Sequence, residues 1–225
     1  MSRSILRQNI FPDPPIPSPA YVLISCFSCG PLDKEAFARG TSVYLVDRVV
    51  PMLPKELSNG ICSLNPKVDR LAMSVFMEID DHGKVVDYRI HESVIRTTER
   101  MVYEDVTKIL EENDSELVAR YSELVDDFRN MERLCRILHQ RRVDRGSIDF
   151  DLEEAKITLD IKGKPVEIKS YEREISSRII EEFMLVCNET VAEHMNWLNV
   201  PFLYRVHEEP DIEKMLDFNE FIHNF

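Results

Sequence analysis

Carboxylates are the residues of this sequence best suited to chemistry, because hard divalent cations such as Mg²⁺ bind carboxylate oxygens. Asp149 and Asp151 alternate around Phe150 and, on a strand, would face the same side about 7 Å apart. Alternation alone is a weak metal signal, so we interpret them as a polar strand face. Glu181 and Glu182 are adjacent on an expected helix and point in different directions. We therefore predict no catalytic residue and no metal ligand from these positions.

The cysteines and histidines give no stronger signal. Cys26 and Cys29 form a CxxC between a short apolar run and an expected helix, which would suit a redox pair or half of a zinc site. No second CxxC follows, so we set that role aside. His194 and His207 lack a neighbouring Cys or Ser and are interpreted as structural. Five cysteines without paired spacing indicate reduced thiols, and we expect a cytoplasmic protein.

The charge of the chain restricts its partners. A formal net charge of -13 argues against a general nucleic-acid coat protein. One short run is nevertheless rich in cations and could form either a local basic surface or an ordinary helix C-terminus: Arg133, Arg136, His139, Arg141, Arg142 and Arg145. No apolar run approaches the about 18 residues that cross a bilayer, so we predict no membrane partner.

The elements that would position these residues are hairpins and long helices, an α+β fold. Apolar residues at helical spacing predict helices over 32–39, 103–112, 115–142, 174–198 and 210–225. Alternation and turn residues predict strands over 70–80 and 84–98, over 149–161 and 165–170, and over 201–206. The helix predicted at 174–198, the third long helix, is expected to bury Ile179, Ile180, Met184 and Val186 among others.

The first thirty residues differ in composition from the rest of the chain. Residues 1–30 are rich in proline, which cannot continue a helix or a central strand, and we predict a loose arm there. Residues 31–225 form the predicted folded body, with no linker after Gly40 that would divide it.

Five separated blocks of the body carry a resemblance. They follow one another in the order Gly40–Arg70, Glu99–Val106, Arg145–Asp151, Ile180–His194 and Pro201–Glu208. Together they resemble the catalytic domain of the ribonuclease R and ribonuclease II family. The resemblance implies a partial catalytic domain of a 3′–5′ exoribonuclease, a Mg²⁺-dependent hydrolase that degrades single-stranded RNA to nucleoside 5′-monophosphates.

The resemblance also implies roles for four residues. Tyr44 would stack on the terminal base, and Phe150 would clamp the other side of the nucleotide stack, contacts that tolerate any base. Tyr103 and Glu181 would contact the backbone or ribose near the 3′ end, where the 2′-OH distinguishes RNA from DNA. Without the resemblance, Tyr103 and Phe150 would be interpreted as core aromatics.

The magnesium ligands of that family form a run of aspartates upstream of the block that begins at Gly40. Here the only aspartate before Asp33 is Asp13, so the resemblance implies that the ligands are absent. The family also continues beyond the last matching block, which predicts a truncated or frameshifted form. Three hypotheses stay open: an exoribonuclease completed by missing segments in trans, a catalytically inactive RNA-binding module, and an acidic scaffold that binds protein.

Overall fold

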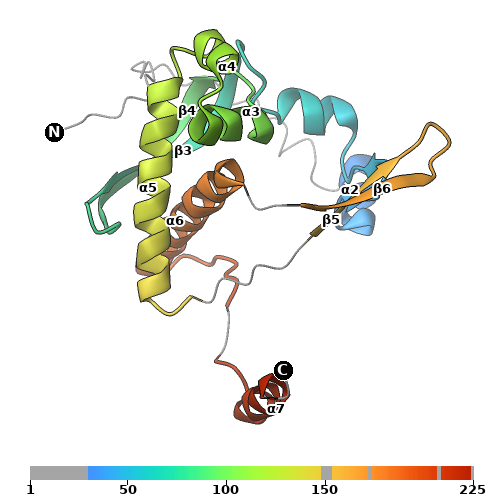
Figure 1. Cartoon of the computed structure of the whole chain (residues 1–225). Coiled ribbons are helices and arrows are strands. Elements are labelled where there is room, and N and C mark those ends of the chain that lie inside the picture. Colours follow the sequence, from blue (N-terminus) through green and yellow to red (C-terminus); the bar gives the residue numbers. More distant parts are fainter. Residues whose placement is uncertain (1–29, 148–153, 172–173, 207–208, 224–225) are drawn as a thin grey trace. The chain divides into compact units, whose positions relative to one another are not determined.

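The computed structural model has an α+β fold in which helices combine with small antiparallel sheets (Figure 1). It divides into two compact units, Met1–Val186 and Cys187–Phe225. The residues that the structure describes are 30–147, 154–171, 174–206 and 209–223. Residues 1–29 of the arm predicted at 1–30, with the CxxC within them, therefore lie outside the described residues.

The first described segment contains short elements. Helix α2 (Pro31–Arg39) confirms the helix predicted at 32–39. Strands β1 (Val43–Tyr44) and β2 (Val49–Val50) pair in antiparallel register, with Tyr44 opposite Val49. The residues of both strands are exposed. A wide helical turn, η1 (Glu56–Ile61), follows.

The first predicted hairpin is confirmed. Strands β3 (Asp69–Ile79) and β4 (Val85–Arg96) pair in antiparallel register along their whole length, with an irregularity after Glu78. Residue exposure follows the period of a half-buried strand over most of β4, but two consecutive residues are exposed at Val86 and Asp87 and again at His91 and Glu92. A cross-strand hydrogen bond of 2.7 Å joins the hydroxyls of Ser74 and Ser93.

The hydrophobic core of the first unit is helical. It contains α3 (Tyr103–Thr107), the wide turn η2 (Lys108–Glu112), α4 (Ser115–Arg120) and α5 (Val125–Asp144). The buried cluster consists of one apolar pair before the α4 helix and one at the start of α5: Val106, Ile109, Val125 and Phe128. The helix predicted at 103–112 is confirmed, although its second half widens into the η2 turn.

The single helix predicted at 115–142 is wrong, because the structure breaks it at residues 121–124. The Asp114 carboxylate caps α4 by accepting the backbone N–H groups of Glu116 and Leu117, each at 3.0 Å. Tyr121 and Leu124, the first and last residues of the break, both pack against the buried cluster. The break thus lets two apolar side chains reach one core, which outweighs the helical periodicity that continues through them.

The second hairpin and the third long helix are confirmed. Strands β5 (Glu154–Leu159) and β6 (Pro165–Tyr171) pair in antiparallel register, and α6 covers Ile175–Trp197. The predicted burial of two α6 residues is wrong, since Ile180 and Met184 are 46% and 54% exposed. Ile179 and Val186 are buried, so the packed face of α6 is narrower than its apolar stripe.

The second unit contains the end of α6 and helix α7 (Ile212–Ile222). Residues 201–206 form no strand, which contradicts the prediction; a strand needs a hydrogen-bonded neighbour, and no described strand pairs with this segment. Helix α7 begins after Asp211, whose carboxylate accepts the backbone N–H of Glu213 at 2.9 Å. The predicted start at Pro210 is thus two residues early. The large apolar side chains of α7 are exposed.

Candidate nucleic-acid interface

Tyr44 presents its ring to solvent. It is the second residue of the short strand β1, and 78% of its surface is exposed. Its neighbours Val43, Leu45 and Val46 are also about half exposed or more. An exposed ring beside other exposed apolar side chains is suited to stacking on a base. The position agrees with the expectation of an accessible ring, while its contact with RNA stays a prediction.

Tyr103 lies at the first residue of α3 and is 45% exposed. Val106, three residues later and therefore on the same side of this short helix, is buried in the core cluster. At 45% exposure, Tyr103 is not the core aromatic that its residue type alone would favour. A half-exposed phenol can both pack and form a hydrogen bond with a ligand.

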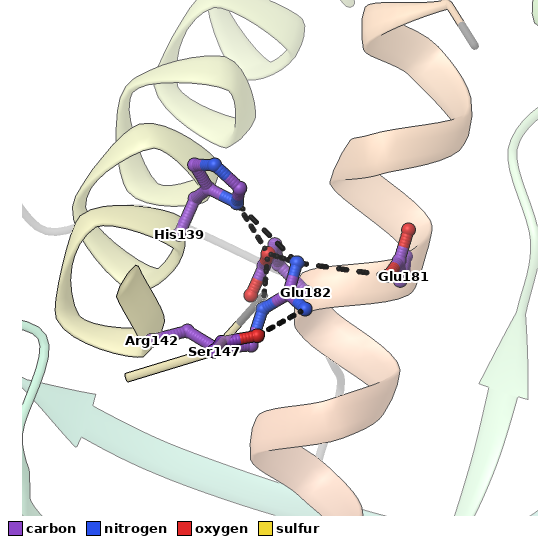
Figure 2. A network of polar contacts seen from close by, with 5 residues as sticks. All are labelled: His139, Arg142, Ser147, Glu181 and Glu182. Atoms are coloured by element: carbon purple, nitrogen blue, oxygen red, sulfur yellow. Dashed lines mark hydrogen bonds and ion pairs between the residues drawn. The ribbon is translucent and has the colours of Figure 1, made fainter. Parts of the chain in front are cut away.

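Glu181 and Glu182 occupy adjacent positions on α6 but have different environments. The Glu181 side chain is 27% exposed, whereas the Glu182 side chain is 4% exposed. A buried carboxylate is costly unless it is paired. The structure pairs Glu182 with two residues of α5 and leaves Glu181 at the edge of the same cluster, as Figure 2 shows.

Arg142 is the central residue of this polar network (Figure 2). Its Nε and Nη2 atoms donate to Oε1 of Glu182 at 3.0 and 2.8 Å, and its Nη1 donates to the Ser147 hydroxyl at 3.2 Å. The Nη2 atom also lies 3.7 Å from Oε1 of Glu181, within ion-pair range. Nδ1 of His139 lies 3.0 Å from the same oxygen of Glu182.

A second polar cluster connects α3 to α6. The Thr107 hydroxyl donates to Oε2 of Glu174 at 2.9 Å and lies 2.8 Å from the hydroxyl of the buried Ser176. Thr107 is one helical turn beyond Tyr103. The helices that carry Tyr103 and Glu181 are therefore joined directly, which brings two of the four predicted RNA-contact residues onto one packed unit.

Several predicted positions are not part of this geometry. Phe150, with Asp149 and Asp151 on either side, lies outside the described residues. The cationic run that ends α5 is described, and much of its charge is used in internal contacts. Arg136 pairs with Glu132 at 2.6 Å, and Arg141 donates to the carbonyl of Gly83 at 2.9 Å. The alternative of a continuous basic surface is therefore weaker than the run suggested.

The described residues do not fit a magnesium site. Among them, no three His, Cys, Asp or Glu side chains come together as a metal ion would require. Cys135, on the α5 face near Glu182, is not a nucleophile: burial, followed by the charge of Glu182, raises the pKa of its thiol to about 11. We assign no step of hydrolysis to a described residue. In the described part of the chain, no helix is apolar over a membrane-spanning length.

The contribution of Arg142 was missed in the sequence, where it was one cation among several in a run. Its principal partner, Glu182, is 40 residues away in the chain. No local periodicity connects the two residues. Only the exclusion of Glu182 from solvent shows that a cation has to face it.

Comparisons with known proteins identify the family to which the chain belongs. A family model described as the RNB domain matches residues 21–225. Ribonuclease R 1 of Lactococcus lactis is 49% identical over 195 residues, covering 87% of this chain and 24% of that protein. Ribonuclease R of Thermotoga maritima is 48% identical over 192 residues, covering 85% and 27% respectively. The solved structure of Mycoplasma genitalium RNase R in complex with ribose methylated single-stranded RNA is similar with a TM-score of 0.78 and 28% identity, covering 90% of this chain and 31% of that one.

These likenesses extend over nearly all of the chain but over only part of each relative. The chain spans about a quarter of the length of the two curated proteins. The fold and the family model both agree with the resemblance seen in the sequence. The chain belongs to the RNB domain family, and the two curated relatives described above are ribonucleases R.

Proposed function

We propose that this chain is part of a ribonuclease R-like 3′–5′ exoribonuclease and that it holds single-stranded RNA. The observation that carries the proposal is the RNB match over residues 21–225, together with ribonuclease R relatives that are 48% and 49% identical. The products would be nucleoside 5′-monophosphates, and the compartment would be the cytoplasm.

The geometry supports a role in holding RNA rather than in cleaving it. Tyr44 and Tyr103 are exposed enough to meet a ligand, and Glu181 lies at the edge of a rigid polar cluster. Stacking supplies affinity without base selectivity, and a carboxylate can accept from a ribose hydroxyl. Mg²⁺ and the carboxylates that bind it would then come from other segments of the same domain, supplied in trans.

A substitution at Tyr44 tests the binding half of the proposal. We expect Tyr44→Ala to weaken the binding of a short single-stranded RNA by about 1 to 3 kcal/mol, the range for one stacked base. The fold should survive, because a ring that is 78% exposed leaves little cavity. Fluorescence anisotropy measures the affinity and thermal unfolding measures the stability.

A matched control is Phe37→Ala, which removes an aromatic ring that is 89% exposed on α2. It should leave the RNA affinity unchanged. If Tyr44→Ala keeps full affinity while its melting temperature falls by many degrees, Tyr44 is a packing residue. If the wild-type chain binds no RNA even at low salt, the chain is instead an acidic protein-binding scaffold, since the electrostatic contribution to RNA binding is largest there.

A nuclease assay tests the catalytic half. We expect the isolated chain to release no nucleotide from a 3′-labelled single-stranded RNA in Mg²⁺. The reason is that no cluster of three or more potential metal ligands occurs among the described residues. Thin-layer chromatography of the labelled products checks this. Release that EDTA abolishes would show that carboxylates of this chain, Asp149 and Asp151 among the candidates, do bind the metal. Equal RNA affinity without release would identify an RNA-binding module.

A further inference from the structure

The guanidinium of Arg142 joins two adjacent glutamates of α6 to the serine that follows α5. It forms two hydrogen bonds to one oxygen of Glu182, a third to Ser147 just after α5, and an ion pair with Glu181 (Figure 2). From the Glu182 side chain, which is 4% exposed, exposure increases through Arg142 at 19% to Glu181 at 27%, and it also increases to His139 at 29%. Glu182 is therefore the buried end of the network, and Glu181 is one of its two accessible ends.

The buried end fixes the orientation of the guanidinium. Nε and Nη2 both point at Oε1 of Glu182, and the planar fork then has little freedom to rotate. Ser147 receives a hydrogen bond from the remaining terminal nitrogen, which holds the plane from the other side. The position of Nη2 beside Glu181 is consequently set by contacts that do not involve Glu181.

The accessible end at Glu181 needs such a support. Glu181 has a long side chain with several rotatable bonds, and it is adjacent to a second carboxylate of like charge. The like charges of the two carboxylates repel each other, and a cation beside both lowers that repulsion. The 3.7 Å separation from Nη2 is an ion-pair distance, longer than a strong charge-assisted hydrogen bond. The ion pair therefore orients the Glu181 carboxylate and leaves it able to accept a shorter hydrogen bond from a ligand.

We propose that Arg142 is a positioning residue that holds the Glu181 carboxylate for a ribose 2′-hydroxyl, and so determines how strongly the chain prefers RNA to DNA. The inference rests on the proposed function, in which Glu181 contacts the RNA near its 3′ end. An ionised carboxylate only accepts, and the 2′-OH is the donor that RNA has and DNA lacks. Arg142 itself does not bind phosphate, because its fork is committed to the two glutamates and Ser147.

The test compares the affinities of the full chain for a short single-stranded RNA and for DNA of the same sequence, by fluorescence anisotropy in EDTA. The wild-type chain is expected to prefer RNA. Glu181→Gln and Arg142→Lys should each lower the RNA affinity by about tenfold, the factor carried by one hydrogen bond to a charged group, and should leave the DNA affinity unchanged. Lysine keeps the charge but cannot reproduce the planar fork.

Arg129→Lys is the matched control, because Arg129 lies on the same helix and, within the described part of the chain, pairs with the exposed Asp126 at 3.4 Å rather than with a residue of the network. It should change neither affinity. In the double variant, Arg142→Lys should add no further loss to that of Glu181→Gln, which shows that Arg142 acts through Glu181. A purely structural role would instead lower both affinities together and add fully to the loss caused by Glu181→Gln.

Circular dichroism and thermal unfolding accompany every titration. If Arg142→Lys is unfolded at the titration temperature, Ser147→Ala replaces it. This variant removes only the neutral acceptor of the Arg142 guanidinium. It should lower the RNA affinity by less than tenfold and leave the DNA affinity unchanged. If the folded Arg142→Lys variant prefers RNA to DNA as strongly as the wild-type chain does, the inference is overturned and the proposed function stays intact. A wild-type chain that binds neither nucleic acid overturns both.

Discussion

Two hairpin turns of this protein have the same local structure. In each, an aspartate carboxylate, that of Asp80 or Asp160, accepts the backbone N–H groups two and four residues further on. The distances are 2.9 and 2.9 Å in the first turn and 2.8 and 2.9 Å in the second. The glycine three residues after the aspartate has a φ of 77° in one turn and 76° in the other. Both strand pairs also have an irregularity next to the turn.

The surroundings of the two turns differ. Gly83 is buried against α5, where Arg141 Nη1 donates to its carbonyl oxygen at 2.9 Å. A Cβ atom on Gly83 would lie 3.3 Å from the carbonyl oxygen and Cγ2 of Ile137. A Cβ atom on Gly163 would meet nothing within 4 Å. The comparison teaches that turn geometry follows from local residues, whereas the tolerance of a turn to change depends on what packs against it.

The largest expected effect separates the two glycines. Gly83→Ala should destabilise the protein by about 2 to 4 kcal/mol, because left-handed strain adds to a close approach to the backbone of α5. Gly163→Ala carries the strain alone and should cost about 1 kcal/mol. Urea unfolding of both variants measures the difference. Equal losses would mean that the contact with α5 adds nothing and that the turns are equivalent.

Arg141 tests the tertiary contact without changing the turn. Arg141→Met should cost about 1 kcal/mol, the usual net value of one hydrogen bond, since it leaves the Gly83 carbonyl without this donor. The control Arg133→Met, at an exposed position of the same helix, should have the unfolding midpoint of the wild type. Combining Arg141→Met with Gly83→Ala should cost less than the sum, because both act on one contact. Strict additivity would count against a shared contact.

The smallest expected effect concerns the charge within the first turn. The backbone N–H of Lys84, helped by that of His82, holds the pKa of Asp80 below its ordinary value of 3.8. A group whose pKa is lowered by folding stabilises the native state above its unfolded pKa, and this stabilisation is lost as the pH falls through the folded value. The stability advantage of the wild type over Asp80→Asn should therefore shrink below pH 3.8. Urea midpoints measured between neutral and acid pH check this; a constant difference would show that the carboxylate charge is irrelevant.

Much of the local structure follows from sequence alone. Proline, glycine and the apolar spacing predict α2, both long hairpins and α6, because each depends on residues close together in the chain. The exposure of Tyr44 was also predictable from its place between a helix-ending glycine and Pro51. The family blocks further indicated an RNB domain, which the comparisons confirm.

Only the tertiary structure decided the remaining features, and in each case the reason is a distant partner. Residues 121–124 leave the helix because Tyr121 and Leu124 share a core with residues earlier in the chain. Arg142 becomes the centre of a polar network because α6 brings the buried Glu182 to it from 40 residues away. Hydrogen bonds and ion pairs between helices have no period in the sequence. The sequence by itself determined the elements and the family, and packing determined which charges are internal and which can meet a ligand.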